Sequence, residues 1–483
     1  MSASLRLMWR EGVSASANGE GTLVVQGPGV RLSLRPKSTA ILDATRRFDT
    51  PGEDQEKLCE LIRGDGDGAL AHWHYCLERL TQHGLLCHVA YADGTRLATL
   101  VAISPYFVSR SAQVTVDRRY VLSRFAYLRR EGVEAVLESP LAHARIILND
   151  CRVAAVVGAL VAPATVGELA ERIGILSAEA ITSVLALLLR AGMLGESAKD
   201  DAPALETWEF HDMLFHARSR RGRFDAPYGG TYRLAGRLAP PPALKPVEAG
   251  EAYELYRPDL DRLQKHDPPL ALVQARRRSI RDYDTTQPIT DRQLGEFLFR
   301  VARATGYREE EIVTPHGPAR MQFAPRPYPA GGGLYELELY AVIQACTKVA
   351  PGLYHYDPAE HRLIRLRGLT AEAAGLLRDA AASTAIAEDT LQVLLILTAR
   401  FPRLAWKYES IAYALTLKHV GVVYQTMYLT ATAMGLAPCA VGGGDADLFA
   451  RAAGTDYYME TSVGEFLLGN PRRSAASCEQ GSG

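Results

Sequence analysis

Two adjacent residues, Lys407 and Tyr408, have the side chains best suited to proton transfer in this sequence. An amine beside a phenol can exchange a proton with a substrate, and a neighbouring positive charge lowers the pKa of a phenol from its ordinary value of about 10. The same dipeptide is often only a solvated lysine beside a packed aromatic ring. The sequence around the pair therefore has to decide between these interpretations.

The pair stands at the start of an apolar run from 406 to 434 that contains no proline and one glycine. Its apolar residues fall on nearly every face of a helix, which predicts a core helix buried all round. We therefore expect Lys407 and Tyr408 on the first helical turn, where the electropositive helix end favours a tyrosinate and disfavours an extra proton on the lysine. Gly435 can cap the other end of the helix, and Pro438 prevents its continuation.

Three further stretches have residues suited to binding a flat or anionic cofactor. The glycines from 442 to 444 expose backbone N–H groups, and the prolines and glycines from 326 to 333 form a loop that can approach a ring closely. Four arginines and a serine from 276 to 281 stand at a predicted helix end and supply donors for a phosphate, although such clusters usually face water. No G-K-[ST] sequence is present, and the glycines from 442 follow a predicted helix instead of a strand. Neither a P-loop nor a Rossmann motif is therefore indicated.

The stretch from 405 to 444 resembles the flavin-dependent azoline oxidases, and most of all the cyanobactin thiazoline oxidases. These are nitroreductase-fold dehydrogenases that convert thiazolines and oxazolines to thiazoles and oxazoles in ribosomally made peptides. The resemblance implies that Lys407 and Tyr408 are the catalytic pair, either of which can be the base, and that FMN is the cofactor. The implied FMN contacts are Arg277, Arg278, Ser279 and Arg281 for the phosphate and ribityl chain, and Pro329, Ala330, Gly331, Gly332, Gly442, Gly443 and Gly444 for the ring. Ala330 replaces a serine that is usual in the wider family, which removes one side-chain hydrogen bond to the flavin.

The first part of the chain is typical of a winged helix. Alternating apolar residues come first, and helical stretches follow from about Thr39 and from 69 to 82. A hairpin from 85 to 101 then turns at Asp93 and Gly94. Two helices followed by a two-stranded wing are the outline of this module.

A second helical pair repeats the plan. The capping box of Thr165 and Glu168 opens a helix from 166 to 173, and a leucine-rich helix follows from 178 to 190. Such a helix-turn-helix ordinarily reads DNA, but its second helix offers only Arg190, at the far end, to a phosphate. The resemblance implies instead that such modules recognise a leader peptide by adding its strand to an exposed sheet edge.

The resemblance implies an α+β fold in which a homodimeric, nitroreductase-like FMN domain follows two winged-helix-like modules. Prolines near residue 240 mark the boundary between these parts. The predicted parts are a winged-helix-like leader-recognition module (1–125), a second winged-helix module (126–239), a proline-rich linker (240–250), the FMN domain (251–472) and a disordered tail (473–483).

The composition excludes several other classes of protein. The 54 basic and 55 acidic residues balance, so the chain has no electrostatic footprint for broad binding of nucleic acid or membranes. No signal peptide or membrane helix is indicated, which predicts a cytoplasmic protein. Seven scattered cysteines without C-x-x-C spacing predict free thiols that are mostly buried. Two histidine pairs, at 72 and 74 and at 211 and 216, lack further ligands, so no metal is expected.

The favoured hypothesis is oxidation of azoline rings in a precursor peptide by FMN, with dioxygen as the simplest final acceptor. One alternative is a flavin oxidase or NAD(P)H-dependent nitroreductase that acts on a small or carrier-bound molecule, although such a substrate needs no peptide-recognition module. An alternative of another class is a DNA-binding winged-helix regulator, for which salt-dependent duplex binding is the discriminating observation.

Overall fold

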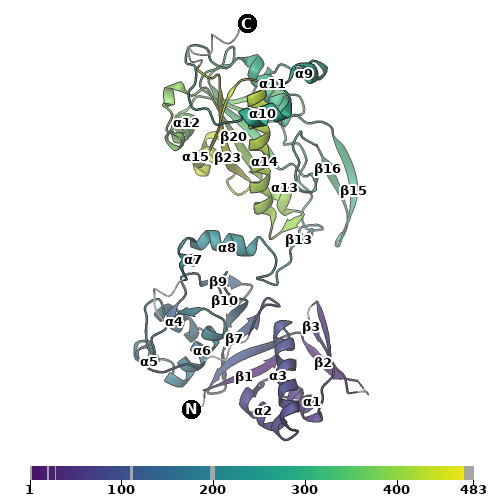
Figure 1. Ribbon diagram of the computed structural model, residues 1–483, viewed down its shortest axis with the longest axis vertical. Coiled ribbons are helices and arrows are strands. Elements are labelled where there is room, and N and C mark those ends of the chain that lie inside the picture. The colour runs from purple at the N-terminus through teal and green to yellow at the C-terminus, as the bar shows by residue number, and fades with distance from the viewer. Residues whose placement is uncertain (1–2, 19–20, 28, 109–112, 196–201, 473–483) are drawn as a thin grey trace. The chain divides into compact units, whose positions relative to one another are not determined.

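The computed structural model describes residues 3–18, 21–27, 29–108, 113–195 and 202–472. The chain divides into two compact units, Met1–Ala226 and Pro227–Gly483, which we call the N-terminal unit and the C-terminal unit (Figure 1). The sequence predicts the linker from residue 240, whereas residues 227–239 already group with the C-terminal unit. The predicted tail from 473 to 483 lies outside the described residues.

The C-terminal unit is built on a seven-stranded antiparallel sheet. Its central strands are buried along almost their whole length, because helices cover both faces. In spatial order the strands are β14 (Glu251–Glu254), β19 (Arg362–Gly368), β18 (Gly352–Asp357), β17 (Leu337–Ile343), β20 (Val393–Arg400), β23 (Glu460–Gly469) and β22 (Ala437–Val441).

Alternate residues of the central strands enter two separate cores, as the two-residue period of a strand requires. Leu339 of β17 packs in the core that α11 and α14 share, and Tyr340 packs in the core that α12 and α15 share. This arrangement confirms the predicted α+β class. The helices and 3-10 turns of the unit are α9 (Leu260–His266), α10 (Leu270–Arg276), α11 (Asp291–Ala302), η1 (Gly331–Gly333), α12 (Ala371–Thr384), η2 (Glu388–Thr390), α13 (Phe401–Ala405), α14 (Ala412–Ala433) and α15 (Ala446–Ala453). Its remaining strands are β13 (Gly229–Gly230), β15 (Arg308–Thr314), β16 (Gly317–Phe323) and β21 (Tyr408–Glu409).

The long helix begins later than the sequence predicts. Helix α13 ends at Ala405, Tyr408 lies in the short strand β21, and α14 begins only at Ala412. The left-handed backbone of Ser410, with φ of 65°, separates the strand from the helix. The prediction that Lys407 and Tyr408 sit on the first helical turn is therefore wrong, and so is the electrostatic argument that depends on it.

The other end of α14 is as predicted. Gly435 is left-handed, with φ of 69°, and the Leu436 N–H donates to the Ala431 carbonyl at 2.8 Å, which closes the helix as a Schellman motif. Pro438 lies in β22, an edge strand, where a missing N–H is tolerated. The glycines from 442 to 444 therefore follow a strand, and the prediction that they follow a helix is wrong.

The N-terminal unit has one seven-stranded sheet to which both predicted modules contribute strands. Asp93 and Gly94 have positive φ values of 52° and 75° and turn the β6–β7 hairpin, as predicted. In spatial order the strands are β5 (Glu53–Asp54), β1 (Ala3–Trp9), β6 (Leu86–Ala92), β7 (Thr95–Ala102), β11 (Ala144–Leu148), β10 (Glu134–Glu138) and β9 (Tyr127–Glu131). The two modules therefore share a sheet.

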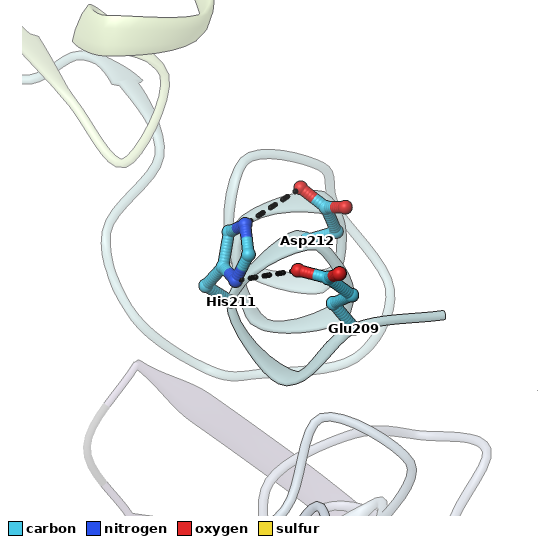
Figure 2. A group of neighbouring side chains, drawn as sticks. All are labelled: Glu209, His211 and Asp212. Carbon is cyan, nitrogen blue, oxygen red and sulfur yellow. Dashed lines mark ion pairs between the residues drawn. The ribbon is translucent and has the colours of Figure 1, made fainter. Parts of the chain in front are cut away.

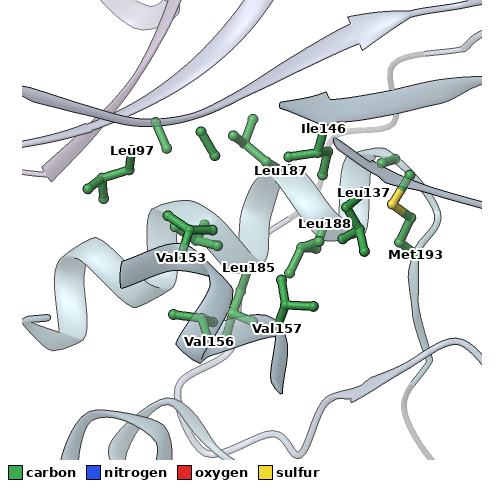
Figure 3. Packing of buried hydrophobic residues seen from close by; sticks show 14 of the residues in the cluster. Leu97, Leu137, Ile146, Val153, Val156, Val157, Leu185, Leu187, Leu188 and Met193 are labelled. Carbon is green, nitrogen blue, oxygen red and sulfur yellow. The ribbon is translucent and has the colours of Figure 1, made fainter. Parts of the chain in front are cut away.

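The second helical pair packs into the core of this sheet (Figure 3). The capping box of Thr165 and Glu168 and the left-handed Gly174 are present as predicted. Helix α6 contacts β1, β6 and β7 and is buried over most of its length, including Leu185 and Leu187. A helix covered by a sheet cannot enter a DNA groove, which argues against the DNA-binding alternative. The helices here are α4 (Arg152–Ala159), α5 (Val166–Ile173) and α6 (Ala178–Arg190).

A smaller three-stranded sheet packs with three helices at the start of the chain. Its core includes Phe48 and Trp73, whose rings stack at a centroid distance of 5.7 Å. These elements are β2 (Ser14–Ala17), β3 (Leu23–Gly27), β4 (Val30–Leu34), α1 (Thr39–Arg46), α2 (Gln55–Arg63) and α3 (Asp67–Gln82). The unit also contains β8 (Val121–Leu122), β12 (Leu194–Gly195), α7 (Pro203–Glu206) and α8 (Phe210–Arg218).

The six described cysteines are free thiols, as predicted. Four of them are buried and Cys346 is half-buried, whereas Cys151 is exposed. Cys478 lies outside the described residues. Within the described part of the chain no single helix is long and apolar enough to cross a membrane, and one pair, α5 and α6, bent by 119°, passes that test only when the two are taken together.

Candidate active site

The functional ends of Lys407 and Tyr408 meet at the backbone of Gly332. A Cβ placed on Gly332 would lie 2.7 Å from the Tyr408 hydroxyl oxygen and 2.8 Å from Lys407 Nζ, so a side chain at this position would have to displace both groups. Gly332 also has φ of 62°, which favours glycine. The predicted catalytic pair and the predicted glycine loop are therefore in contact.

The surroundings of Lys407 are aromatic. Its Nζ lies 5.3 Å from the centroid of the Tyr408 ring and 5.5 Å from that of Tyr232, and both rings attract a cation through their π faces. The Lys407 N–H donates to the Leu404 carbonyl at the end of α13. Tyr232 was not among the predicted site residues, because nothing near it in the sequence connects it with Lys407.

A buried pair, Glu336 and His419, holds the glycine loop. The Gly331 N–H donates to His419 Nε2 at 2.7 Å, and His419 Nδ1 lies 2.7 Å from Glu336 Oε1. Since Nε2 accepts a hydrogen bond, the ring proton is on Nδ1 and is donated to the carboxylate. The Gly331 N–H is thus already engaged and is not available to a cofactor. Sequence reasoning missed both residues, since a single histidine on an apolar helix is usually a satisfied core residue.

The arginine stretch follows the end of α10, as predicted. The Ser279 hydroxyl lies 2.7 Å from the Tyr428 hydroxyl, and the Arg277 guanidinium lies 5.4 Å from the centroid of the Tyr428 ring. Arg278 and Arg281 are exposed, so both guanidinium groups can reach a ligand from solvent. Tyr428, on α14, was not predicted as a site residue.

The arginine stretch also lies beside the strand that leads to the triple glycine. The Ile280 N–H donates to the Pro438 carbonyl at 2.9 Å, and the Ala440 N–H donates to the Tyr428 hydroxyl at 2.8 Å. Burial raises the pKa of the neighbouring Cys439 thiol, although Arg281 and Ser279 act in the opposite direction. Two of the three predicted cofactor stretches are therefore neighbours.

Gly442, Gly443 and Gly444 are exposed, and of the three only Gly444 lies close to another side chain. A Cβ on Gly444 would lie 2.3 Å from a carboxylate oxygen of Glu465, whereas one on Gly442 or Gly443 would meet no atom within 4 Å. Glu465 is 8% exposed, and burial raises its pKa above the ordinary value. A carboxyl group was not predicted at this position.

The predicted catalytic pair and the arginine stretch do not converge on one point. His419 of α14 contacts the glycine loop, and Tyr428 of the same helix contacts the arginine stretch. Nine residues of helix separate them, which is about 13 Å along the axis. The candidate site is therefore elongated along α14, with Lys407 and Tyr408 near one end and the arginines near the other.

The N-terminal unit has a cavity of about 520 Å³ that is separate from these residues. It is lined by side chains of α2, α3, β6 and α6, among them His88 and Arg190. Burial and the charge of Arg190 lower the pKa of His88 to about 3, so this imidazole is neutral in the folded protein.

Three exposed side chains at the start of α8, Glu209, His211 and Asp212, form a surface group of ion pairs (Figure 2). His211 Nδ1 lies 3.5 Å from a Glu209 oxygen and His211 Nε2 lies 3.4 Å from an Asp212 oxygen. The imidazole bridges the two carboxylates. Exposed groups of this kind are common without a metal, and no metal role is assigned.

Family comparisons cover most of the chain. The family described as ThcOx helix turn helix domain matches residues 1–109, the family described as cyanobactin oxidase ThcOx matches residues 120–225, and the nitroreductase family matches residues 275–469. The chain is similar to the cyanobactin oxidases over two of these three stretches. These matches confirm the resemblance, the nitroreductase-type fold of the C-terminal unit and the assignment as an oxidoreductase.

Individual relatives match the nitroreductase-like part of this chain. "Putative nitroreductase MJ1384" of Methanocaldococcus jannaschii is 28% identical over 193 residues, which are 40% of this chain and 85% of that protein. The structure of a putative nitroreductase from Anabaena variabilis is 22% identical, with a TM-score of 0.35. The match covers 53% of this chain and 45% of that chain, so this chain spans less than half of that relative's length.

Two further solved structures show the same level of likeness. The E. coli microcin synthetase McbBCD complex with truncated pro-MccB17 bound is 19% identical, with a TM-score of 0.34 and coverage of 41% of this chain and 70% of that chain. A putative nitroreductase in complex with FMN from Exiguobacterium sibiricum is 13% identical, with a TM-score of 0.30. The match covers 43% of this chain and 90% of that chain. At these TM-scores the structural likeness decides nothing further.

Proposed function

We propose that this chain uses bound FMN to oxidise thiazoline or oxazoline rings of a ribosomally made precursor peptide. In this proposal Lys407 and Tyr408 carry out the proton transfer. The observation that carries the proposal is the meeting of both functional groups at the bare backbone of Gly332. Because glycine has no side chain, the loop does not cover Lys407 and Tyr408 with one. A planar ring can therefore approach the two functional groups from solvent.

The residues expected to hold FMN suit an anionic, planar group. The exposed guanidinium groups of Arg278 and Arg281 can bind a phosphate with two hydrogen bonds each. Gly442 and Gly443 present their backbone without obstruction from this chain. FMN, when bound, supplies the acceptor for the hydride.

Aromatisation of an azoline removes a proton from the ring carbon derived from the amino acid α carbon and a hydride from the adjacent ring carbon. Tyr408 is the proposed general base, because its hydroxyl oxygen reaches the glycine loop. Lys407 is the proposed partner that stabilises the phenolate. If Lys407 is the base instead, replacing Lys407 would remove the proton-transfer step, and replacing Tyr408 would not. Dioxygen is the proposed final acceptor.

A homodimer is part of the proposal. The prediction that α14 is buried all round is wrong for a single chain, since Tyr413 and Leu417 are 49% and 40% exposed. Tyr458 and Met459 of the same unit are 83% and 55% exposed. Exposed apolar side chains on a helix of apolar composition favour burial against a second copy, which would also close the elongated site.

The N-terminal unit offers a place for the peptide. Strand β2 is exposed along its length, and among the described residues it pairs with β3 alone, so one edge of its backbone can pair with another strand. All four residues of β2 line a pocket of about 430 Å³, together with Trp9, Leu23 and Leu42. We propose that the precursor peptide adds to β2 as a further strand, with apolar side chains in the pocket.

The first test is an anaerobic reaction of the purified full chain with a peptide that contains an unoxidised azoline. The expected result is loss of the oxidised flavin absorbance together with a peptide lighter by two hydrogens. Flavin that stays oxidised with the peptide and is reduced by NAD(P)H would favour the nitroreductase alternative. A protein that cannot be reconstituted with FMN would overturn the proposal.

A second test concerns the base. Tyr408→Phe is expected to keep bound FMN and to lower kcat by about 10²-fold to 10⁴-fold, the usual contribution of a positioned base. Lys407→Gln is expected to have the smaller effect. A Tyr408→Phe enzyme with the wild-type rate would show that the base is assigned to the wrong residue.

A further inference from the structure

One segment of the C-terminal unit, residues 227–243, lies outside both neighbouring family matches, which end at residue 225 and resume at residue 275. We call this segment the strap. It precedes the first strand of the main sheet, and its hydrogen bonds reach residues on both sides of the catalytic pair.

The strap pairs with the backbone of the catalytic pair. Gly229 and Gly230 form β13, which pairs antiparallel with Glu409 and Tyr408 of β21. Beyond the end of this ladder, the Tyr232 N–H donates to the Lys407 carbonyl at 3.0 Å. A ladder of two residues is marginal by itself, so the side chains around it must contribute to its stability.

Side chains of the strap contact both residues that flank the pair. The Tyr232 ring lies 5.5 Å from Lys407 Nζ and meets the Trp406 ring edge-on at 5.8 Å. On the other side, the Thr231 hydroxyl donates to the Glu409 carboxylate at 2.9 Å. The pair is thus held by the strap before Lys407 and after Tyr408.

The backbone of Tyr232 is left-handed, with φ of 55°. Aromatic residues rarely adopt this conformation, and it persists only where surrounding contacts impose it. The contacts to Lys407 and Trp406 are the ones that do so here. A strained residue that touches a catalytic lysine is a candidate for a positioning role.

The second half of the strap is anchored by buried side chains of the same region. Trp406 Nε1 donates to the Leu238 carbonyl at 2.8 Å, and the Arg403 guanidinium donates to the Pro241 carbonyl at 2.6 Å and to the Leu334 carbonyl at 2.9 Å. Arg403 is 1% exposed, and burial lowers its pKa to about 10. Since Leu334 follows the glycine loop, Arg403 fixes the strap relative to that loop.

We propose that the strap positions the catalytic pair, and that Tyr232 is the strap residue that holds the Lys407 ammonium against Gly332. The kinetic part of this inference rests on the proposed function, and the structural part does not. Tyr232 is a positioning residue, because it touches Lys407 and no reacting atom of the substrate is required to touch it.

The test uses three variants of the full chain. Tyr232→Leu removes the ring and is expected to lower kcat at least tenfold, with KM and FMN content within twofold of wild type. Tyr232→Phe keeps the ring and is expected to stay within twofold in all three quantities. Tyr307→Leu, a change at a tyrosine of the same unit that is 55% exposed, is the matched control and is expected to have no effect.

Amide hydrogen exchange supplies a measurement that does not need turnover. In Tyr232→Leu the β21 amides are expected to exchange at least tenfold faster, while those of α14 stay as in wild type. Faster exchange with an unchanged kcat would overturn the positioning role, and so would a lower kcat with unchanged exchange. If the wild-type chain fails to oxidise an azoline peptide, the proposed function is wrong. Unchanged amide exchange in Tyr232→Leu would separately show that the strap does not hold β21. Thr231→Val, which removes only the bond to Glu409, gives the same readout should Tyr232→Leu fold poorly.

Discussion

The Gly331 N–H donates a 2.7 Å hydrogen bond to Nε2 of His419, a residue 88 positions later in the chain. This bond fixes the glycine loop to α14, and the opposite ring nitrogen is fixed in turn by Glu336, which is fully buried. The loop that meets Lys407 and Tyr408 is therefore held from behind by a neutral histidine and a carboxylate.

Replacing His419 should lower the free energy of unfolding, because the buried Glu336 carboxylate then has no hydrogen-bond donor. His419→Leu leaves Glu336 without its donor and the Gly331 N–H without its acceptor, and we expect a loss of about 3 kcal/mol in the free energy of unfolding. Glu336→Gln keeps an acceptor for His419 Nδ1 and is expected to lose only about 1 kcal/mol. Denaturant unfolding of both variants measures the difference. Equal losses would show that the hydrogen bonds are not what stabilises the loop.

Gly332→Ala should damage catalysis more than it damages the fold. The new Cβ would lie 2.7 Å and 2.8 Å from the functional atoms of Tyr408 and Lys407, and φ at this position is 62°. Because side-chain ends can move aside, we expect FMN to stay bound while kcat falls about tenfold or more. Gly306→Ala is the matched control, since a Cβ there meets no atom within 4 Å. A Gly332→Ala enzyme as fast as the control would contradict the contact.

Arg278→Ala tests the phosphate end of the site. Loss of one charge-assisted contact of about 1.5 kcal/mol raises the Kd for FMN about tenfold. Equilibrium dialysis or quenching of flavin fluorescence measures the Kd. Arg320→Ala changes a side chain of β16 that is 77% exposed and should leave the Kd unchanged. Full FMN retention in Arg278→Ala would remove this residue from the phosphate site.

The pH dependence of stability should report on His88. Its pKa is lowered from 6.5 to about 3 by burial, so the unfolded chain binds a proton below pH 6.5 that the folded chain does not bind. This contribution is absent above pH 7 and lowers the free energy of unfolding by up to about 1.4 kcal/mol per pH unit as pH falls from 6.5 toward 3. Urea unfolding at pH 8 and pH 5, followed by tryptophan fluorescence, measures it.

His88→Leu serves as the comparison for this measurement. The variant has no proton to gain, so its stability should fall less than that of wild type between pH 8 and pH 5. Parallel decreases in the two proteins would show that His88 is not responsible.

Several features could be predicted because they depend on residues close together in the sequence. The capping box of Thr165 and Glu168 and the turn at Asp93 are settled by local hydrogen bonds and by backbone preferences. The start of α14 could not be predicted in the same way. Its apolar pattern continues through Lys407, and the break comes from strand pairing with β13, a segment far earlier in the chain.

The candidate site likewise has features that depend on local sequence and features that depend on contacts between distant segments. The sequence by itself determined the resemblance to the azoline oxidases, the predicted roles of Lys407 and Tyr408, and the start and end signals of most helices, since each depends on residue types in short stretches. Only the tertiary structure decided that Gly332, Tyr232 and the His419–Glu336 pair surround Lys407 and Tyr408. The physical reason is that these contacts join distant segments through sheet pairing and buried hydrogen bonds, which leave no periodic pattern in the sequence.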